Sequence, residues 1–206
     1  MKALEFRARM VIPSDYRPAR HVAINLGFGA LAVLAALAAI SDLRAIELWA
    51  LPVTFVAMNL LEYTSHRWLM HRRTRLLPYA FEAHTLQHHA SFSAANMAVE
   101  SPREFRLILF GTRQIVLFMI ATLPGFALLA WLAPKNAVLL AVAMVFVHYL
   151  LYEGLHLIDH LPADHALCRF RALASFRRRH AAHHGNARRG FNVTFPLSDW
   201  LSLIHI

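Results

Sequence analysis

The feature that most constrains this chain is a set of four long apolar stretches. They cover residues 21–40, 45–66, 114–133 and 136–157. A helix needs about 20 mostly apolar residues to cross the hydrocarbon core of a bilayer, and each stretch has that length. Pro52 interrupts the second stretch, which a membrane helix tolerates because neighbouring groups satisfy the freed carbonyl. We therefore predict an all-α integral membrane protein with four transmembrane helices.

The composition supports this class and excludes others. Hydrophobic residues make up 58% of the 206 residues and charged residues 16%, whereas about 25% of the residues in a soluble domain are charged. The net charge of +9 comes from basic residues in the segments that flank the apolar stretches, so we exclude nucleic-acid binding, which needs a basic water-facing surface. Cys168 is the single cysteine, which excludes an internal disulfide and a multi-cysteine metal site.

The connections between the stretches divide them into two pairs. Only "SDLR" separates the first stretch from the second, and "APKN" lies between the third and the fourth. We therefore expect two helical hairpins in a single domain, residues 1–206. Residues 67–112 and 158–206 would form a helical cap beside the membrane.

Charge sets the orientation of these spans. Of the 21 Lys and Arg residues, only Arg44 and Lys135 fall in the two short links. The others precede the first span, lie between the second and third, or follow the fourth. Because cytoplasmic loops carry the excess of Lys and Arg, we expect both termini and the cap to be cytoplasmic. The first span is expected to direct insertion, since the N-terminal residues lack the apolar region of a cleavable signal.

Ten of the 14 histidines fall into four groups, all on this predicted cytoplasmic side. Two groups close the second and fourth spans, one lies in the middle loop, and one lies in the C-terminal tail. In chain order they are His66 and His71; His84, His88 and His89; His156 and His160; and His180, His183 and His184. The orientation follows from Lys and Arg alone, so this agreement is independent support for one shared site.

The spacing within these groups is typical of metal ligands. Neutral imidazole binds iron, zinc, copper and nickel, and residues three or four apart share one face of a helix. The sets with this spacing are His156 with His160, His84 with His88, and His180 with His183 and His184. His66 and His71 are five apart, so we expect the helix to end or bend between them. Ten imidazoles exceed the four to six ligands of one ion, whereas two ions would take about five each.

The remaining histidines are expected to have other roles. His148 lies alone within a span, where an interhelical hydrogen bond is the expected role. His21 and His205 are predicted to be interfacial, and His165 is left unassigned. A haem would need histidines paired at matching depths inside the spans, and His148 has no such partner.

With their flanking residues, the four groups resemble the histidine boxes of the fatty acid hydroxylase/sterol desaturase superfamily of integral membrane di-iron enzymes. The segments that carry the resemblance are "EYTSHRWLMH" (62–71), "HTLQHH" (84–89), "YEGLHLIDH" (152–160), "HAAHH" (180–184) and "GFNVTFPLSDW" (190–200). The first box is closest in form to fatty acid 2-hydroxylases, with carotenoid hydroxylases as near relatives. Two departures are the three residues between His84 and His88, where that type usually has two, and Glu153 in place of a more usual Asp.

The resemblance implies a ligand set and a reaction. All ten grouped histidines would bind two iron ions, which zinc could replace in purified protein, and O2 would be the co-substrate. Acidic and amide side chains nearby could orient the imidazole N–H groups; the candidates are Glu62, Glu153, Asp159 and Asn192. The implied activity is hydroxylation of an unactivated C–H bond in a fatty acyl chain or similar apolar substrate. Desaturation and carotenoid or sterol hydroxylation are alternatives on the same scaffold.

The implied partners follow from the same resemblance. The substrate would be a membrane lipid or an isoprenoid, which a cleft between the spans could admit; Phe55, Met58, Met144 and Phe146 are candidate lining residues. Without a fused cytochrome b5 domain, electrons would come from a separate ferredoxin or cytochrome b5-like protein. A metal transporter or sensor is the alternative from another class, but it should carry ligands at mid-membrane on several spans, and only His148 lies there. A purely structural lipid-binding protein would leave the histidine spacing unexplained.

Overall fold

The computed structural model describes residues 3–202. All the regular secondary structure of these residues is helical, and they contain no β-strand. The helices, in chain order, are α1 (Ala3–Arg9), α2 (Pro18–Ala38), η1 (Ala45–Trp49), α3 (Ala50–Ser65), η2 (His66–Met70), α4 (Pro78–Phe81), η3 (Glu82–His89), η4 (Pro102–Leu107), α5 (Thr112–Leu132), α6 (Lys135–Asp159), η5 (Ala166–Arg169), α7 (Arg171–Gly185) and α8 (Leu197–Leu201). The prediction of an all-α chain is confirmed for the described residues.

Four of these helical segments are long and apolar enough to cross a membrane. They are Pro18–Ala38, Ala45–Met70, Pro102–Leu132 and Lys135–Asp159. The four predicted spans are thus present, and all their ends except the start of the third differ by a few residues, because the polar turns at the ends of a span carry no hydropathy signal. The largest difference is in the third span, where α5 is preceded by the short helix η4.

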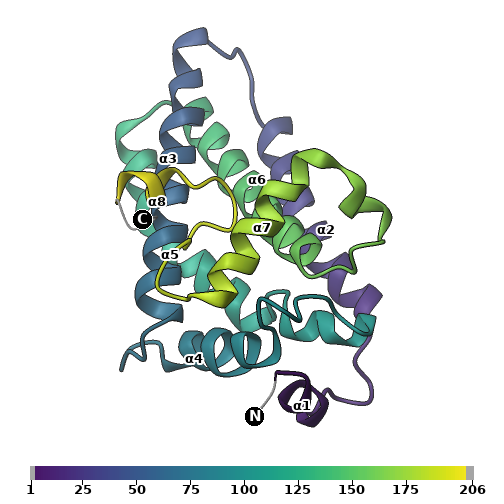
Figure 1. Ribbon diagram of the computed structural model, residues 1–206. Helices are drawn as coiled ribbons and strands as arrows, with labels where there is room; N and C mark the ends of the chain where they lie inside the picture. Colours follow the sequence, from purple (N-terminus) through teal and green to yellow (C-terminus); the bar gives the residue numbers. More distant parts are fainter. Residues whose placement is uncertain (1–2, 203–206) are drawn as a thin grey trace.

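Helix α6 is the centre of the bundle and packs against α2, α3 and α5 (Figure 1). In the most apolar 18-residue stretch of α6, 56% of the residues are buried, whereas in the corresponding stretch of the third span, which contains α5, 6% are buried. Close approach between α2 and α6 depends on Gly29, where a Cβ atom would lie 2.7 Å from Leu150 Cδ2. Small residues at such contacts let membrane helices pack closely. The helices α2 and α3, which a hairpin would place side by side, meet mainly through α6.

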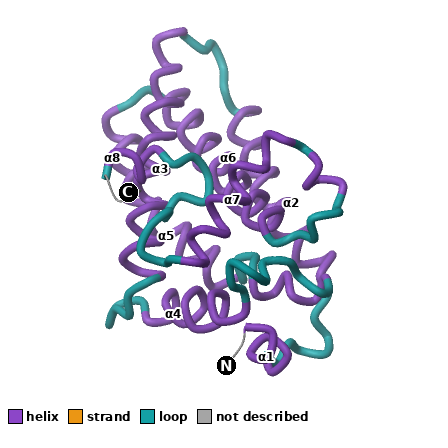
Figure 2. The backbone as a smooth tube through the Cα atoms, in the orientation of Figure 1, coloured by secondary structure: helices purple, strands orange, loops and turns teal. Residues whose placement is uncertain are grey.

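The two short links meet at one end of the bundle. Asn136 Nδ2 at the start of α6 donates hydrogen bonds to Ser41 O (2.8 Å) and to Glu47 Oε2 (3.1 Å). At the other ends of these helices the chain adds the short helices α4, η3 and η4, while α7 crosses in front of α6 (Figures 1 and 2). The four predicted histidine groups all lie on these added elements or on the helix ends beside them.

Candidate metal centre

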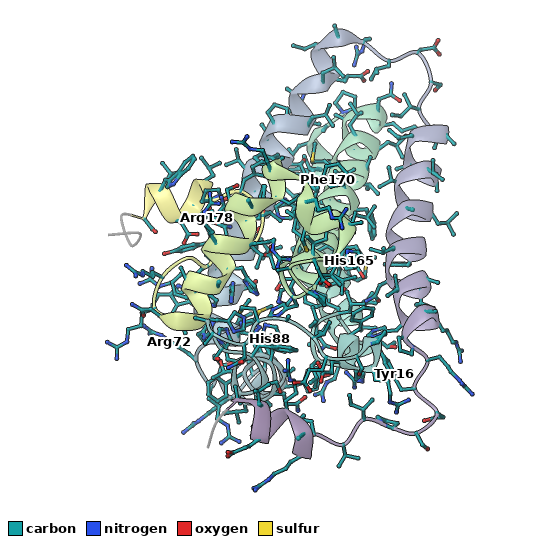
Figure 3. All side chains as sticks on the ribbon, turned by 45° about the vertical axis from the view of Figure 1, so that its right-hand side comes forward. Tyr16, Arg72, His88, His165, Phe170 and Arg178 are labelled. Carbon is teal, nitrogen blue, oxygen red and sulfur yellow. The ribbon has the colours of Figure 1, made fainter. Side chains whose placement is uncertain are left out.

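The structure brings all ten predicted histidines into one cluster. Their ligand atoms form two groups, within each of which the atoms lie within 4.8 Å of one another. The first group is His66, His71, His84, His89 and His183, and the second is His88, His156, His160 and His180. His184 joins the second group, because its Nε2 lies 3.1 Å from His88 Nε2 and 3.2 Å from His180 Nε2. The result is five imidazoles around each of two neighbouring centres, close to His88 in Figure 3.

Two π-helical turns present five of these side chains. In η2 the His71 N–H donates to the His66 carbonyl at 3.1 Å, which is the i→i+5 hydrogen bond of a π-helix. This wider turn places residues five apart on one face, and the rings of His66 and His71 stack with centroids 5.0 Å apart. The predicted bend between these two residues is therefore a π-turn. Helix η3 has the same form and presents His84, His88 and His89.

Two pairs of neighbours on one helix share a group as predicted, His156 with His160 and His180 with His184, all in the second group. His84 and His88 belong to different groups, and so do His180 and His183. The rings of both divided pairs lie nearly parallel, with interplanar angles of 22°. Parallel rings direct their Nε2 atoms side by side instead of toward one point. The position of two histidines on the same face of a helix therefore does not determine whether they can bind the same ion.

The ring nitrogens show that the cluster is built for cations. Five Nδ1 atoms lie within hydrogen-bond distance of a backbone carbonyl: His66 at Phe191 O (2.5 Å), His88 at Leu107 O (3.0 Å), His160 at Met97 O (2.7 Å), His183 at Arg189 O (2.8 Å) and His184 at Phe92 O (2.9 Å). A carbonyl only accepts, so Nδ1 carries the proton and Nε2 of a neutral ring carries a lone pair.

These lone pairs face one another at short range. The Nε2 atoms of His88 and His184 are 3.1 Å apart, although both rings use their Nδ1–H on a carbonyl. Two acceptors cannot form a hydrogen bond, and buried unsatisfied acceptors are costly. A metal cation between them satisfies both at once. The residues present therefore fit a metal pair.

The electrostatics favour the neutral, metal-binding form of the rings. Burial, reinforced by the neighbouring imidazoles, lowers the pKa of His71 and of His184 to about 3, and burial lowers that of His183 to about 4. The same causes lower the pKa of the cluster histidines His84, His88, His89, His160 and His180. Because protonation and metal binding compete for the same nitrogen, low pKa values keep the site ready for a metal near neutral pH.

The side chains predicted to orient these imidazoles have other partners. Glu62 accepts hydrogen bonds from Val193 N (2.6 Å) and Thr194 N (3.0 Å). Glu153 accepts from the side chain of Asn25 and from Phe110 N. Asp159 and Asn192 likewise make no hydrogen bond to a cluster imidazole among residues 3–202, and both carboxylate oxygens of Asp159 are buried without a partner. Five of the rings instead meet backbone carbonyls, which leave no signal in the sequence.

Some of these side chains act one step further out, through the loop that follows α7. This loop carries the Phe191 carbonyl that meets His66. The Asp199 carboxylate accepts from Phe191 N and Asn192 N, both at 2.9 Å, and Asn59 Oδ1 accepts from Ser198 N at 2.9 Å. Together with Glu62 they tie the loop to α3. Sequence reasoning missed Asn59 and Asp199, because a buried polar residue shows its partner only in the folded chain.

The histidines outside the cluster have structural contacts. His148 Nε2 lies 3.0 Å from Glu62 Oε2, which joins α6 to α3 as predicted for an interhelical hydrogen bond. His21 contacts Tyr16 and Phe110, and His165 Nδ1 accepts from Leu167 N at the start of η5. His205 lies outside the described residues.

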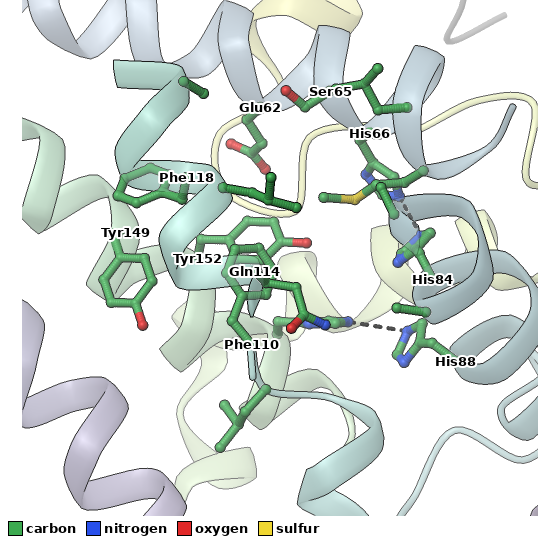
Figure 4. Close-up of a pocket in the computed structure, with 18 of the residues that line it drawn as sticks. Glu62, Ser65, His66, His84, His88, Phe110, Gln114, Phe118, Tyr149 and Tyr152 are labelled. Carbon is green, nitrogen blue, oxygen red and sulfur yellow. Dashed lines mark hydrogen bonds between the residues drawn. The ribbon is translucent and has the colours of Figure 1, made fainter. Parts of the chain in front are cut away.

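A largely apolar cavity of about 190 Å³ reaches the cluster (Figure 4). Its walls come from α3, α5 and α6, and include Met58, Phe118 and Tyr152. One end is formed by four cluster histidines, two from each group: His66, His84, His88 and His156. The other end reaches His148, eight residues before His156 on α6 and so about 12 Å away along the helix.

Of the four side chains predicted to line such a cleft, only Met58 does so. Phe55 packs against Phe195, with ring centroids 5.6 Å apart, and Phe146 packs against Phe28 at 5.5 Å. Met144 is not among the lining residues either. Hydropathy marked these residues as membrane-embedded, but the rotation of each helix decided which side chains face the cavity.

Comparison with known protein families gives one match. The model for the fatty acid hydroxylase family matches residues 51–202, which contain all ten cluster histidines. No curated protein and no solved structure matches the chain. The family is one of metal-dependent membrane oxidoreductases of the hydroxylase or desaturase type. Because the match covers most of the chain, this protein belongs to the fatty acid hydroxylase family.

Proposed function

We propose that this protein is an O2-dependent di-iron hydroxylase that inserts oxygen into an unactivated C–H bond of a membrane lipid, such as a fatty acyl chain. The observation that carries the proposal is the cavity that ends at both imidazole groups. A largely apolar cavity of this kind fits a hydrocarbon chain. Its contact with both groups would place one carbon of that chain beside two metal ions.

The ligand set fits iron with a position left for the reaction. Five imidazoles would hold each ion and would leave an octahedral ion able to bind O2 or water as well. The first group and the second group, completed by His184, would each hold one iron. Zinc binds such sites well and could replace iron in purified protein. The bound iron pair would supply the O2 chemistry and the oxidising power, which belong to the cofactor and not to the protein.

The contribution of the protein is position, protonation state and dryness. The backbone carbonyls hold the imidazoles in the tautomer that points Nε2 at the metal. Residues such as Met58 and Phe118 surround the substrate chain and keep water out of the cavity. Excluding water protects the reaction from side products and strengthens the electrostatic interactions within the site.

The surroundings of the cluster fit a cytoplasmic site that receives electrons from a soluble or membrane-attached donor. Arg72 and Arg178 are exposed on the face that carries the cluster (Figure 3). With the excess of Lys and Arg on that side, the positive-inside rule favours a cytoplasmic location for the termini and the metal site. A basic surface also favours association with an acidic ferredoxin or cytochrome b5-like protein.

Two alternatives make different predictions. A desaturase or a carotenoid or sterol hydroxylase would use the same metal pair and the same cavity, and differs only in its product. A metal transporter or sensor would need ligands along a path through the membrane. In the described spans the mid-membrane histidine, His148, is bonded to Glu62 instead.

Product analysis in cells tests the proposal. Cells that produce the unmodified protein should contain a lipid or pigment with one added oxygen. That product should disappear in His88→Ala and His183→Ala, which remove one ligand from each group. It should persist in the control His165→Ala, since His165 lies outside both groups. A product with two hydrogens fewer and no added oxygen would identify a desaturase.

A second pair of variants tests the cavity. Ala121→Trp fills the cavity at α5 and should reduce product formation roughly tenfold or more without loss of metal. The control Ala127→Trp places the same side chain on α5 outside the cavity and should leave the product unchanged. Full metal content with an unchanged lipid profile in all cells would contradict the proposal and favour sensing or transport.

A further inference from the structure

A second pocket lies where α2 and α5 begin, apart from the imidazole cluster. Its volume is about 280 Å³, and its charged lining consists of Arg17, Arg20 and Arg106 against one carboxylate, Asp15. The rest of the lining is Tyr16, His21, Ile24, Asn25, Gly111, Thr112 and Ile115. Three guanidinium groups in one pocket repel one another. An excess of positive charge of this kind needs an anion for balance.

The three arginines are free to bind one. All three are exposed, and none makes an ion pair or side-chain hydrogen bond with another residue in the part of the chain that the structure describes. Arg103 nearby is different, because its guanidinium donates to the backbone carbonyls of Tyr16, Ile12 and Pro13. Arg103 therefore shapes the segment before α2, whereas the three pocket arginines have no such structural task.

The wall behind the arginines is held in place by hydrogen bonds. The Phe110 carbonyl lies 2.9 Å from both His21 Nε2 and Asn25 Nδ2, and His21 Nδ1 lies 2.8 Å from the Tyr16 hydroxyl. Glu153 of α6 accepts from Phe110 N and from Asn25. These bonds fix the start of α2 against the turn before α5. The pocket is thus formed before a ligand arrives, which lowers the entropic cost of binding.

The position of the pocket identifies the kind of anion. Arg17 and Arg20 stand at the start of one membrane span, and Arg106 stands just before α5 in another. Below them, toward the bilayer, the lining continues with the apolar side chains of Ile24 and Ile115. An amphiphile fits this order, with its phosphate among the guanidinium groups and its chains along α2 and α5. Basic pockets between membrane helices recognise anionic lipid headgroups in this way.

We propose that this pocket binds the phosphate of an anionic phospholipid headgroup. The site is separate from the metal centre, and the proposal stands whether or not the chain is a hydroxylase. Arg106 also lines the substrate cavity, so the bound lipid would lie beside that cavity and help to close its wall at the membrane surface.

Native mass spectrometry of the full chain in detergent micelles tests this site, with phosphatidylglycerol and phosphatidylcholine as the lipid probes. The unmodified protein should retain phosphatidylglycerol in preference to phosphatidylcholine. In R17Q/R20Q/R106Q the retention should weaken about a hundredfold, since each arginine near an anionic phosphate contributes roughly fivefold. The control R171Q/R178Q/R188Q removes the same charge from the α7 region and should retain the lipid; Figure 3 shows Arg178 on the opposite side of the molecule from Tyr16.

Two further arms decide between the sources of the anion and guard against misfolding. Inorganic phosphate at the same concentration should not displace phosphatidylglycerol; displacement would identify a site for free phosphate and overturn the lipid assignment. Equal loss in the control would show non-specific attraction and would also overturn it. The charge-preserving R17K/R20K/R106K should retain the lipid within a few-fold, which a collapsed pocket could not do. If R17K/R20K/R106K lost the lipid while its thermal midpoint stayed unchanged, the phosphate would not be held by the positive charge of these side chains, and the proposal would be overturned.

Discussion

At the scale of single residues, the two nitrogens of a cluster imidazole have different tasks. Five of the imidazoles place Nδ1 against a backbone carbonyl and thereby direct Nε2 into the cluster. The two groups are also filled by different residues, even where those residues are neighbours on one helix. Loss of one ligand should therefore affect one ion and not the other.

This division predicts the metal content of single variants. His71→Ala removes a ligand of the first group alone, and His160→Ala removes a ligand of the second alone. Each should lose about half of the bound metal, because the affected centre keeps four imidazoles instead of five while the other centre keeps its full set. The double variant should lose nearly all of it. Elemental analysis of the purified proteins measures this, and a loss of both ions in each single variant would show that the groups act as one site.

The lowered pKa values predict how the metal-free protein responds to pH. Burial lowers the pKa of His71, His183 and His184 from 6.5 to about 3, 4 and 3. Between those values and 6.5 the unfolded chain binds more protons than the folded one, so stability rises with pH in this window. The stabilisation is present above pH 6.5 and is lost as the pH falls toward the folded pKa values.

Thermal unfolding of chelator-treated protein in micelles measures this effect. The midpoint should fall when the pH is lowered from about 7 to about 5. His165→Ala should show the same slope, because this residue lies in η5 and outside the cluster. The variant His71→Ala/His184→Ala should show a shallower one. Midpoints that do not change with pH in the unmodified protein would contradict the neutral form of the cluster.

At the scale of elements, the contact between α2 and α6 sets the bundle. Gly29 faces Leu150 and Tyr149 so closely that an added Cβ would lie within 3.0 Å of their atoms, whereas Gly27 has nothing within 4 Å. Gly29→Val should lower the free energy of unfolding by about 1–3 kcal/mol through overpacking. Gly27→Val makes the same change on a lipid-facing side of α2 and should have little effect. Equal thermal midpoints for the two variants would contradict close packing at Gly29.

At the scale of the whole molecule, the two ends of the bundle carry different chemistry. The short links near Ser41 and Asn136 form one end, and the imidazole cluster lies toward the other. Because nearly all Lys and Arg residues flank the cluster side, that side should face the cytoplasm.

A membrane-impermeant maleimide tests this orientation. Cys168, the single cysteine, has its Sγ 4.0 Å from the Ile158 carbonyl at the cluster end of α6, and it should react only after the cells are permeabilised. In Asp42→Cys/Cys168→Ser the only thiol lies in the link between α2 and η1, and it should react in intact cells. The reverse pattern would place the metal site outside the cytoplasm.

The sequence by itself determined the class of the protein and the identity of the candidate ligands. An apolar stretch of about 20 residues crosses a bilayer as a helix, because only internal hydrogen bonds can satisfy its backbone there. The ten histidines grouped on the positively charged side are the metal ligands that the sequence indicates. Both are properties of residue type and spacing, which do not require knowledge of contacts. The five-residue interval between His66 and His71 even indicated the irregular turn that the structure shows as a π-helix.

Only the tertiary structure decided how those residues divide and what supports them. His84 and His88 share a helical face but serve different groups, because the rings of the other three elements approach each of them from different sides. The carbonyls that orient the rings, and the ties made by Asn59 and Asp199, join side chains to backbone groups that only the folded chain brings together; the bond from His66 to Phe191 O and that from Ser198 N to Asn59 each span more than a hundred residues. Hydrogen-bonding groups that every residue carries cannot be assigned partners from residue type alone.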